Sequence, residues 1–260
     1  ELSEFYKEVF FQETASVSYQ AAYSDEELKW ERLRGEVVIE ALRQALQPGD
    51  LVNRSFMEIG CGEGFLLRAA RNAKLIILGM DFTGHAIDAF HPELRPYFRE
   101  GDTTQAIASL IQNGEQFNFV GIQNVLEHVV DPEELLSNMR HLLTSEGLAI
   151  IQVPNDFSRL QLAARKQGLI DTDYWFDPPM HLHYFNHQNI HTLLNKCGFK
   201  AIDVFGDFPI EFFLFNDKAN YSLQPENGKS AHHARVRLDL AIAESGLPNY
   251  LEYCRGLARC

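Results

Sequence analysis

The sequence predicts an α/β fold in which a mostly parallel sheet is covered by helices on both faces, a doubly wound arrangement. Three observations lead to this prediction. Short apolar segments alternate with helix-like segments along most of the chain, the turn residues between them are spread evenly, and no internal repeat or low-complexity tract interrupts the alternation. Such alternation is typical of βαβ crossovers, which place consecutive strands parallel and bury them under helices.

Length and composition are those of an ordinary globular chain. The 260 residues, of which 45 % are hydrophobic, suffice for one large domain or for a domain with an appendage. The 36 acidic residues exceed the 23 basic residues and give a formal net charge of −13. A charge of this sign repels phosphate backbones and anionic membranes. We therefore expect no nucleic-acid partner.

The cysteines and the apolar runs indicate a compartment. The four cysteines, Cys61, Cys197, Cys254 and Cys260, show no C-x-x-C spacing, and nothing at the start of the chain is typical of a secretory signal. No apolar run approaches the roughly 18 residues that a membrane span needs. We expect reduced thiols, no membrane span and a cytoplasmic protein. The oligomeric state is not indicated.

A helix is expected ahead of the alternation, over residues 25–46. Apolar residues recur there at helical spacing, and Pro48-Gly49 ends the pattern. We expect residues 1–48 to form an N-terminal helical cap. Three aromatic residues in this part, Tyr19, Tyr23 and Trp30, could close over a bound ligand as a lid.

Strand-like and helix-like segments then follow in turn. Strands are expected at residues 55–60, 74–81, 97–102, 117–125, 147–153 and 199–207, with EFFLFN at residues 211–216 as a candidate seventh strand. Helices are expected between them at residues 65–72, 84–90, 103–113, 132–143 and 187–196. These elements predict a seven-stranded sheet in a core of residues 49–216.

Two regions depart from this alternation. Residues 154–185 form an insertion after the fifth strand that is longer than an ordinary loop and rich in aromatic residues and histidine. Long connections at the C-terminal edge of a parallel sheet usually shape a substrate pocket. Residues 217–260 are expected to be a C-terminal helical segment, because the stretch ARVRLDLAIAES within them is typical of a helix.

A glycine-rich stretch joins the first predicted strand to the next helix. In SFMEIGCGEGFLLRAA, residues 55–70, Gly60, Gly62 and Gly64 stand at every second position. Glycines at such a junction allow a tight turn and let a ligand approach the backbone, while the helix N-terminus offers unpaired N–H groups. The stretch therefore predicts a ligand cradle, with Cys61 as a small filling residue inside it.

The spacing of these glycines argues against a dinucleotide. A dinucleotide-binding loop has the pattern G-x-G-x-x-G, but here Phe65 stands where the last small residue belongs. Glu58, at the strand end, is a poor neighbour for a pyrophosphate and a good one for an ammonium group or its bound water. A nicotinamide-dependent oxidoreductase is the alternative that fits less well.

Polar side chains also follow the next three predicted strands. Asp81, 21 residues after the first glycine of the loop, can accept both hydroxyls of a ribose, and Phe82 beside it can pack on a purine. Asp102 can accept an adenine amino proton or can cap the helix that follows it. Asn124 offers its side chain and carbonyl to a cationic group.

In this order, the motifs resemble those of the class I S-adenosylmethionine-dependent methyltransferases. The matching stretches are E58-I-G-C-G-E-G64, G-M-D81, G-D102-T and V-L-E-H128, within about residues 25–207. The later H181-L-H-Y-F185, followed by C-G-F199, resembles the small-molecule branch that includes ubiquinone-type O-methyltransferases and enzymes tailoring glycans or natural products.

The resemblance implies a Rossmann-like fold, S-adenosylmethionine as the cofactor, and methyl transfer to a hydroxyl of a small-molecule or glycan acceptor. A non-catalytic module that keeps the fold is a further alternative, but such a module would have no physical need for three well-placed acids. The cofactor-binding residues that the resemblance implies are Glu58, Gly60, Cys61, Gly62, Gly64, Asp81, Phe82, Asp102, Thr103, Asn124, Val125 and Glu127.

Two histidines are candidates for a general base. The sulfonium methyl is already strongly electrophilic, so a base matters chiefly when the acceptor is a hydroxyl. His128 and His181 follow the fourth strand and end the insertion, and we favour His181 because aromatic residues flank it on both sides. A metal could be suggested by four histidines, His181, His183, His187 and His191, the last two at i, i+4 spacing. No supporting carboxylate pattern is evident, so no metal site is expected.

Overall fold

The computed structural model describes residues 23–178 and 180–258. The chain forms two compact units, which we describe separately. The first unit comprises the described residues up to Val125 together with Glu133–Gln152, and the second comprises Leu126–Pro132 and the described residues from Val153 onward. This division does not coincide with the predicted boundaries at residues 48/49 and 216/217, and the three-part division stays a prediction.

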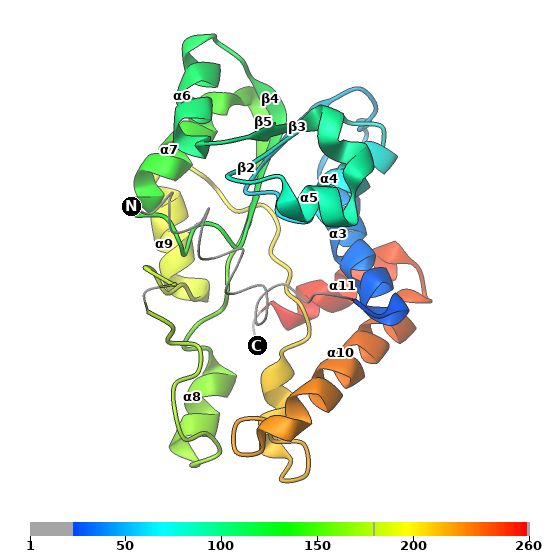
Figure 1. The fold of residues 1–260 in the computed structure, drawn as a ribbon, viewed down its shortest axis with the longest axis vertical. Helices are drawn as coiled ribbons and strands as arrows, with labels where there is room; N and C mark the ends of the chain where they lie inside the picture. The colour runs from blue at the N-terminus through cyan, green and yellow to red at the C-terminus, as the bar shows by residue number, and fades with distance from the viewer. Residues whose placement is uncertain (1–22, 179, 259–260) are drawn as a thin grey trace. The chain divides into compact units, whose positions relative to one another are not determined.

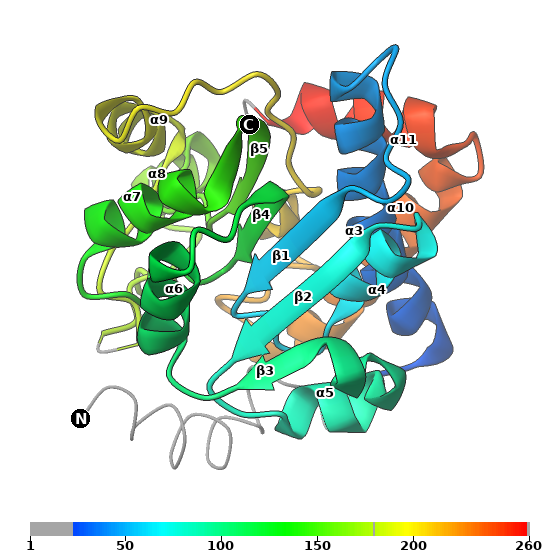
Figure 2. The ribbon, with the colours of Figure 1, turned by 90° about the horizontal axis from the view of Figure 1, so that it is seen from above.

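The first unit contains a parallel five-stranded sheet with the order β3-β2-β1-β4-β5 (Figure 2). Its strands are β1 (Ser55–Ile59), β2 (Ile76–Asp81), β3 (Phe98–Glu100), β4 (Phe117–Gln123) and β5 (Leu143–Gln152). The order reverses direction after β3, so β1 and β4 lie side by side at the centre and their carboxyl ends share one edge. In a sheet of this kind ligands bind at that edge, next to the switch in strand order.

Helices lie on both sides of this sheet, as the alternation predicted. They are α3 (Asp25–Ala45), α4 (Phe65–Asn72), α5 (His85–Phe90), α6 (Thr103–Gln112) and α7 (Pro132–Leu142), with the 3₁₀ helix η3 (Pro92–Tyr97) before β3. Figure 1 shows α6 and α7 on one side of the strands and α3, α4 and α5 on the other. The doubly wound parallel arrangement is therefore confirmed.

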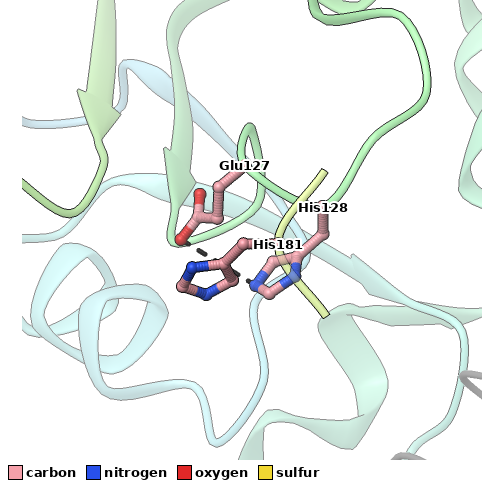
Figure 3. Close-up of side chains that lie close together, drawn as sticks. All are labelled: Glu127, His128 and His181. Carbon is pink, nitrogen blue, oxygen red and sulfur yellow. Dashed lines mark ion pairs between the residues drawn. The ribbon is translucent and has the colours of Figure 1, made fainter. Parts of the chain in front are cut away.

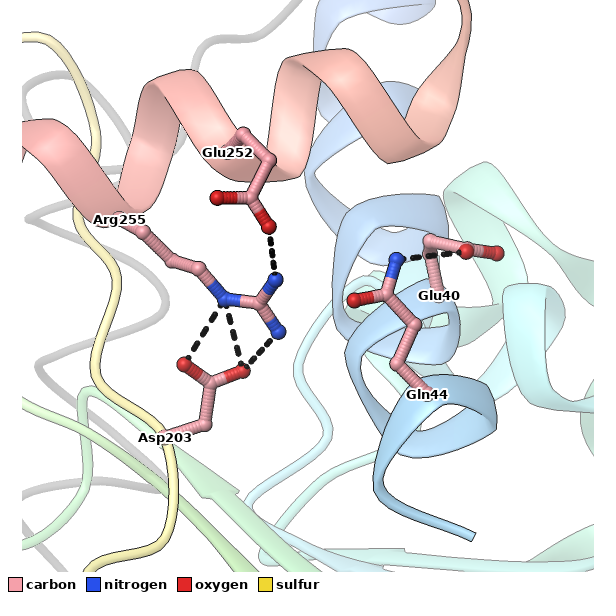
Figure 4. A network of polar contacts seen from close by, with 5 residues as sticks. All are labelled: Glu40, Gln44, Asp203, Glu252 and Arg255. Carbon is pink, nitrogen blue, oxygen red and sulfur yellow. Dashed lines mark hydrogen bonds and ion pairs between the residues drawn. The ribbon is translucent and has the colours of Figure 1, made fainter. Parts of the chain in front are cut away.

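The predicted N-terminal helix packs closely against α4. Ser24 begins α3 with a capping box, in which its side chain accepts from the Glu27 amide and the Glu27 carboxylate accepts from the Ser24 amide. Gly35 lies at the contact, where an added Cβ would stand 3.0 Å from the Phe65 carbonyl oxygen and 3.2 Å from the Ala69 Cβ. Near the end of α3, the Gln44 side-chain amide donates a hydrogen bond of 3.0 Å to the Glu40 carboxylate, one turn earlier (Figure 4).

The prediction of seven strands is wrong for the described residues, in which the sheet has five. Residues 199–207 form no strand, and residues 211–216 fall largely in the 3₁₀ helix η4 (Ile210–Phe215). The backbone of the first of these segments is tied elsewhere, because the Gly206 amide donates to the Cys254 carbonyl of helix α11 (Leu247–Leu257) at 3.0 Å. Apolar alternation indicates an extended segment, but pairing depends on distant partners.

The second unit is mostly helical. It contains α8 (Arg159–Lys166), α9 (His187–Lys196), α10 (Gly228–Ala243) and α11, with the 3₁₀ helices η4 and η5 (Pro225–Asn227). Helix α8 lies inside the predicted insertion, and α10 and α11 lie inside the predicted C-terminal helical segment, in which only the α10 stretch was singled out. Ala164, Ile170, Trp175 and Leu214 form a buried apolar cluster that joins α8, the insertion and η4.

One charged network ties α11 to residues 199–207 (Figure 4). The Arg255 guanidinium donates to both carboxylate oxygens of Asp203, at 2.6 Å from Nη2 and 3.0 Å from Nε, and it also donates to Glu252. A fork-shaped pairing of this kind fixes direction as well as distance.

None of the helices within the described residues is both long and apolar enough to cross a membrane.

Candidate functional site

The glycine loop that follows β1 is built from left-handed backbone. The φ angles of Gly60, Gly62 and Gly64 are +67°, +49° and +81°. Residues that carry a side chain rarely adopt such backbone angles. Gly64 immediately precedes α4, and no described side chain caps that helix N-terminus. The loop therefore has a left-handed backbone conformation that glycines take readily, and its role as a ligand cradle stays a prediction.

Space as well as conformation requires glycine in this loop. A Cβ at Gly60 would lie 2.5 Å from a Val125 methyl, and a Cβ at Gly64 would lie 2.7 Å from an Ile87 methyl. Val125, which was predicted to bind the cofactor, thus packs directly against Gly60. Cys61 is 6 % exposed, and burial raises the pKa of its thiol well above the ordinary value. This agrees with a filling role rather than a nucleophile.

Asp81, at the end of β2, ties the loop to the sheet. Its carboxylate accepts the Gly62 amide at 2.9 Å and the Phe82 amide at 2.7 Å, one on each oxygen. Burial raises the pKa of Asp81 to about 6, although hydrogen bonds from backbone amides oppose the rise. A carboxylate has about four acceptor positions, so backbone amides do not use all of them.

Glu58 lies beneath the loop in the centre of the sheet. It pairs in register with Gly79 of β2 and Gly121 of β4, and these small neighbours let α4 approach, since a Cβ at Gly79 would meet Leu67 at 2.5 Å. Glu58 is 2 % exposed, and its Oε2 has no hydrogen-bond partner among the described residues. Burial, and then the nearby Asp81, raise the pKa of Glu58 well above its ordinary value.

The acid after β3 caps the next helix. The Asp102 carboxylate accepts the Thr104 amide at 2.9 Å and the Gln105 amide at 3.2 Å, and Thr103 is the first residue of α6. Both roles considered from the sequence require Asp102 at this position, and the structure shows the capping role. Contact with adenine stays a prediction.

The residue after β4 has a strained backbone. Asn124 has a φ of +52° and its amide donates to the Gln152 carbonyl of β5 at 3.0 Å. Asparagine tolerates this region better than most residues. Asn124 and Val125 therefore stand at the same carboxyl edge as Glu58, the glycines, Asp81, Phe82, Asp102 and Thr103, all within the first unit.

Sequence reasoning missed a contact between the loop and the start of α3. The Tyr23 hydroxyl donates to the Glu63 carboxylate at 2.9 Å, and the Tyr23 ring packs edge-on against Phe65 at 6.0 Å between centroids. The residues are 40 apart, so no local signal could reveal the pair. Of the predicted lid residues, Trp30 is a core residue at 4 % exposure, and Tyr19 lies outside the described residues.

The second unit brings together Glu127, His128 and His181 (Figure 3). A nitrogen or oxygen atom from each lies within 4.8 Å of those from the other two. His128 Nε2 lies 3.8 Å from Glu127 Oε1, and the two imidazole rings meet edge-on with centroids 4.9 Å apart. The two candidate bases are therefore neighbours, and the carboxylate beside them was predicted for the cofactor instead.

Backbone hydrogen bonds hold this cluster in place. The Glu127 carbonyl accepts the Leu182 amide at 2.8 Å and the His183 amide at 3.1 Å. His128 Nδ1 lies 2.7 Å from the Met180 carbonyl oxygen. A carbonyl only accepts, so Nδ1 of His128 carries the hydrogen. The V-L-E-H and H-L-H-Y-F motifs are thus joined through main-chain atoms.

Burial sets the protonation of the cluster. It lowers the pKa of His128 and of His181 below the ordinary value, with Asp177 opposing the change at both. It also raises the pKa of Glu127 to about 7, assisted by the nearby Asp156. Both imidazoles are accordingly neutral at pH 7. The three side chains have the chemistry to hold a metal ion as well, and the expectation of no metal stays a prediction.

Comparison with known families decides the class of protein. A family model described as a methyltransferase domain matches residues 30–204. The chain belongs to the methyltransferase-domain family. This membership confirms the enzyme class expected from the loop and the acids, an S-adenosylmethionine-dependent methyltransferase. The match therefore favours this class over the two alternatives, a nicotinamide-dependent oxidoreductase and a non-catalytic module.

Relatives and solved structures are distant from this methyltransferase. The ubiquinone biosynthesis O-methyltransferase of Histophilus somni (strain 2336) is 24 % identical over 192 residues, which cover 67 % of this chain and 79 % of the relative. That of Pasteurella multocida (strain Pm70) is 23 % identical over 199 residues, covering 68 % and 80 %. The crystal structure of a SAM-dependent methyltransferase from Archaeoglobus fulgidus has a TM-score of 0.51 at 21 % identity, covering 79 % and 92 %, and shows a shared fold.

Proposed function

We propose that this methyltransferase transfers a methyl group to a hydroxyl of a small-molecule or glycan acceptor, with the cofactor at the glycine loop and His181 as the general base. The observation that carries the proposal is the Asp81 carboxylate, which fixes the loop through Gly62 and keeps acceptor positions for a ribose. The scattered cysteines, without C-x-x-C spacing, support a cytoplasmic enzyme.

The residues at the carboxyl edge of the sheet suit S-adenosylmethionine. Asp81 would accept hydrogen bonds from the ribose hydroxyls, and Phe82 would pack against the adenine ring. Glu58 has a buried oxygen without a partner in the described structure, which suits the cationic ammonium group. At Gly60 and Gly64 a Cβ would clash with Val125 and Ile87. When bound, the cofactor supplies a methyl group on a cationic sulfur, which leaves as a neutral thioether.

The histidines suit an oxygen acceptor. His181 is half-buried and neutral, as a base must be before it takes a proton. In the transfer, the acceptor oxygen would take the methyl group from the cofactor, whose sulfur would keep the electrons of the broken bond, and the hydroxyl proton would pass to His181. The imidazolium then releases that proton to water. Relatives named as O-methyltransferases support an oxygen acceptor.

A mass-spectrometric screen tests the proposal. The purified enzyme is incubated with S-adenosylmethionine and a library of phenols, sugars and amines, and products are sought that are heavier by one methylene. We expect products from hydroxyl compounds, with the methyl on oxygen. Methylated amines without methylated hydroxyls would contradict the acceptor class. No transfer, despite cofactor binding, would contradict the enzyme's small-molecule role.

A further inference from the structure

An imidazole nitrogen in the second unit lacks a hydrogen-bond partner. His181 Nδ1 is buried and bonds to no described residue, and both carboxylate oxygens of Glu127 are in the same state. Buried polar atoms without partners are uncommon in native proteins and need an explanation. Figure 3 shows a nitrogen of the His181 ring turned toward the Glu127 carboxylate. The two groups are complementary, since one can donate and the other can accept.

We propose that Glu127 is a positioning residue for His181, accepting the Nδ1 proton of that ring in a hydrogen bond and leaving the lone pair on Nε2 for the acceptor hydroxyl. This inference rests on the proposed function for the role of Nε2, but its structural claim does not. The two groups are neighbours, because one nitrogen or oxygen atom of each residue in the cluster lies within 4.8 Å of those of the other two.

The surroundings favour His181 over His128 as the ring that Glu127 orients. Nδ1 of His128 is already engaged by the Met180 carbonyl at 2.7 Å. The His181 backbone amide donates to the Asp177 carbonyl at 2.9 Å. Nδ1 of its ring has no hydrogen-bond partner among the described residues. The carboxylate therefore supplies the orientation that the backbone does not.

The Glu127 side chain can be substituted while the backbone hydrogen bonds that hold the cluster together are kept. The hydrogen bonds from Leu182 and His183 end on its main-chain carbonyl, at 2.8 Å and 3.1 Å. Glu127→Leu removes the acceptor, and Glu127→Gln keeps an acceptor without the charge. Asp156→Asn is the matched control, since Asp156 is also buried, with an oxygen that lacks a described partner.

The tautomer of His181 is the direct readout. Long-range proton–nitrogen correlation spectra of the full chain, labelled with ¹⁵N-histidine, distinguish Nδ1–H from Nε2–H, and His181→Ala assigns the signal. We expect Nδ1–H in the wild type, in Asp156→Asn and in Glu127→Gln, and its loss in Glu127→Leu. We also expect Glu127→Leu to lower kcat about 10- to 100-fold with little change in KM, as for other partners that orient a functional imidazole.

Several outcomes would overturn the inference. They are Nε2–H at His181 in the wild type, an unchanged tautomer in Glu127→Leu, and a stoichiometric divalent ion in the purified protein whose removal by EDTA shifts the His128 and His181 signals. If Glu127→Leu does not fold, the wild-type spectrum still decides. Failure of the proposed function would appear instead as absent product with the expected tautomer.

Discussion

The glycine loop of the first unit and the histidine cluster of the second satisfy their polar groups in opposite ways. In the loop, the Asp81 carboxylate accepts hydrogen bonds from two backbone amides. The glycines adopt positive φ angles that cost glycine little. In the cluster, backbone hydrogen bonds fix the chain, while Glu127 and His181 have side-chain atoms without hydrogen-bond partners among the described residues. The Asp81 carboxylate is thus already engaged by backbone amides, whereas the cluster contains groups that can exchange a proton.

The largest expected effect concerns the cluster. His181→Ala should lower turnover of an acceptor found in the screen ~10²–10⁴-fold, because it removes the base, while cofactor affinity stays within a few-fold. Steady-state kinetics and calorimetric titration measure the two quantities. His187→Ala, which removes an exposed imidazole from α9, serves as the control. A parallel loss of turnover and cofactor binding would show that His181 is structural.

A smaller effect is expected in the loop. Asp81→Ala should weaken binding of S-adenosylmethionine by roughly 1.5–3 kcal/mol, because the ribose loses a charged acceptor and the Gly62 amide loses its anchor. Isothermal titration calorimetry measures the change. Asp88→Ala removes the same side chain from α5 and should leave affinity unchanged. Equal affinities in Asp81→Ala and wild type would remove the ribose assignment.

The pH dependence of binding should identify Asp81 as well. Its pKa is raised to about 6, so the carboxylate is ionised at pH 7.5 and becomes protonated as the pH falls through 6. Protonation removes an acceptor position, so the affinity for S-adenosylmethionine should fall by up to about tenfold between pH 6 and pH 5. Calorimetry on wild type and Asp81→Asn should show this dependence only in the wild type. A dependence retained in the variant would assign it to another group.

Crowding in the loop can be separated from its backbone angle. Gly60 and Gly114 have nearly equal φ angles, +67° and +69°, but only at Gly60 would a Cβ meet another atom, at 2.5 Å. Gly114→Ala should lower the free energy of unfolding by about 1 kcal/mol, from backbone strain alone. Gly60→Ala should cost about 1–3 kcal/mol more, because Val125 is displaced. Chemical denaturation measures both, and equal losses would mean that crowding is unimportant.

Local rules explain what could be predicted from the sequence. The five strands and the loop follow from short apolar segments, glycine spacing and the acids at strand ends, all readable within a few residues. Asp102 illustrates a limit, because capping and ligand binding place the same residue type at the same position. The burial of Glu58 between Gly79 and Gly121 depends on strand register, which only the structure gives.

Contacts between distant segments could not be predicted. Tyr23 reaches Glu63 across 40 residues, and His128 reaches the Met180 carbonyl across 52 residues. Neither partner has a distinctive sequence signal, and a backbone carbonyl has none at all. Residues 199–207 show the same limit for strands, since their alternation was visible but their hydrogen bonding to α11 was not.

Titration of the wild-type protein with S-adenosylmethionine, S-adenosylhomocysteine and NADH tests the central claim most directly. The claim is that the loop and Asp81 form a site for S-adenosylmethionine. We expect both adenosyl compounds to bind with micromolar or tighter affinity and NADH to give no measurable heat. Binding of NADH without binding of either adenosyl compound would contradict the account.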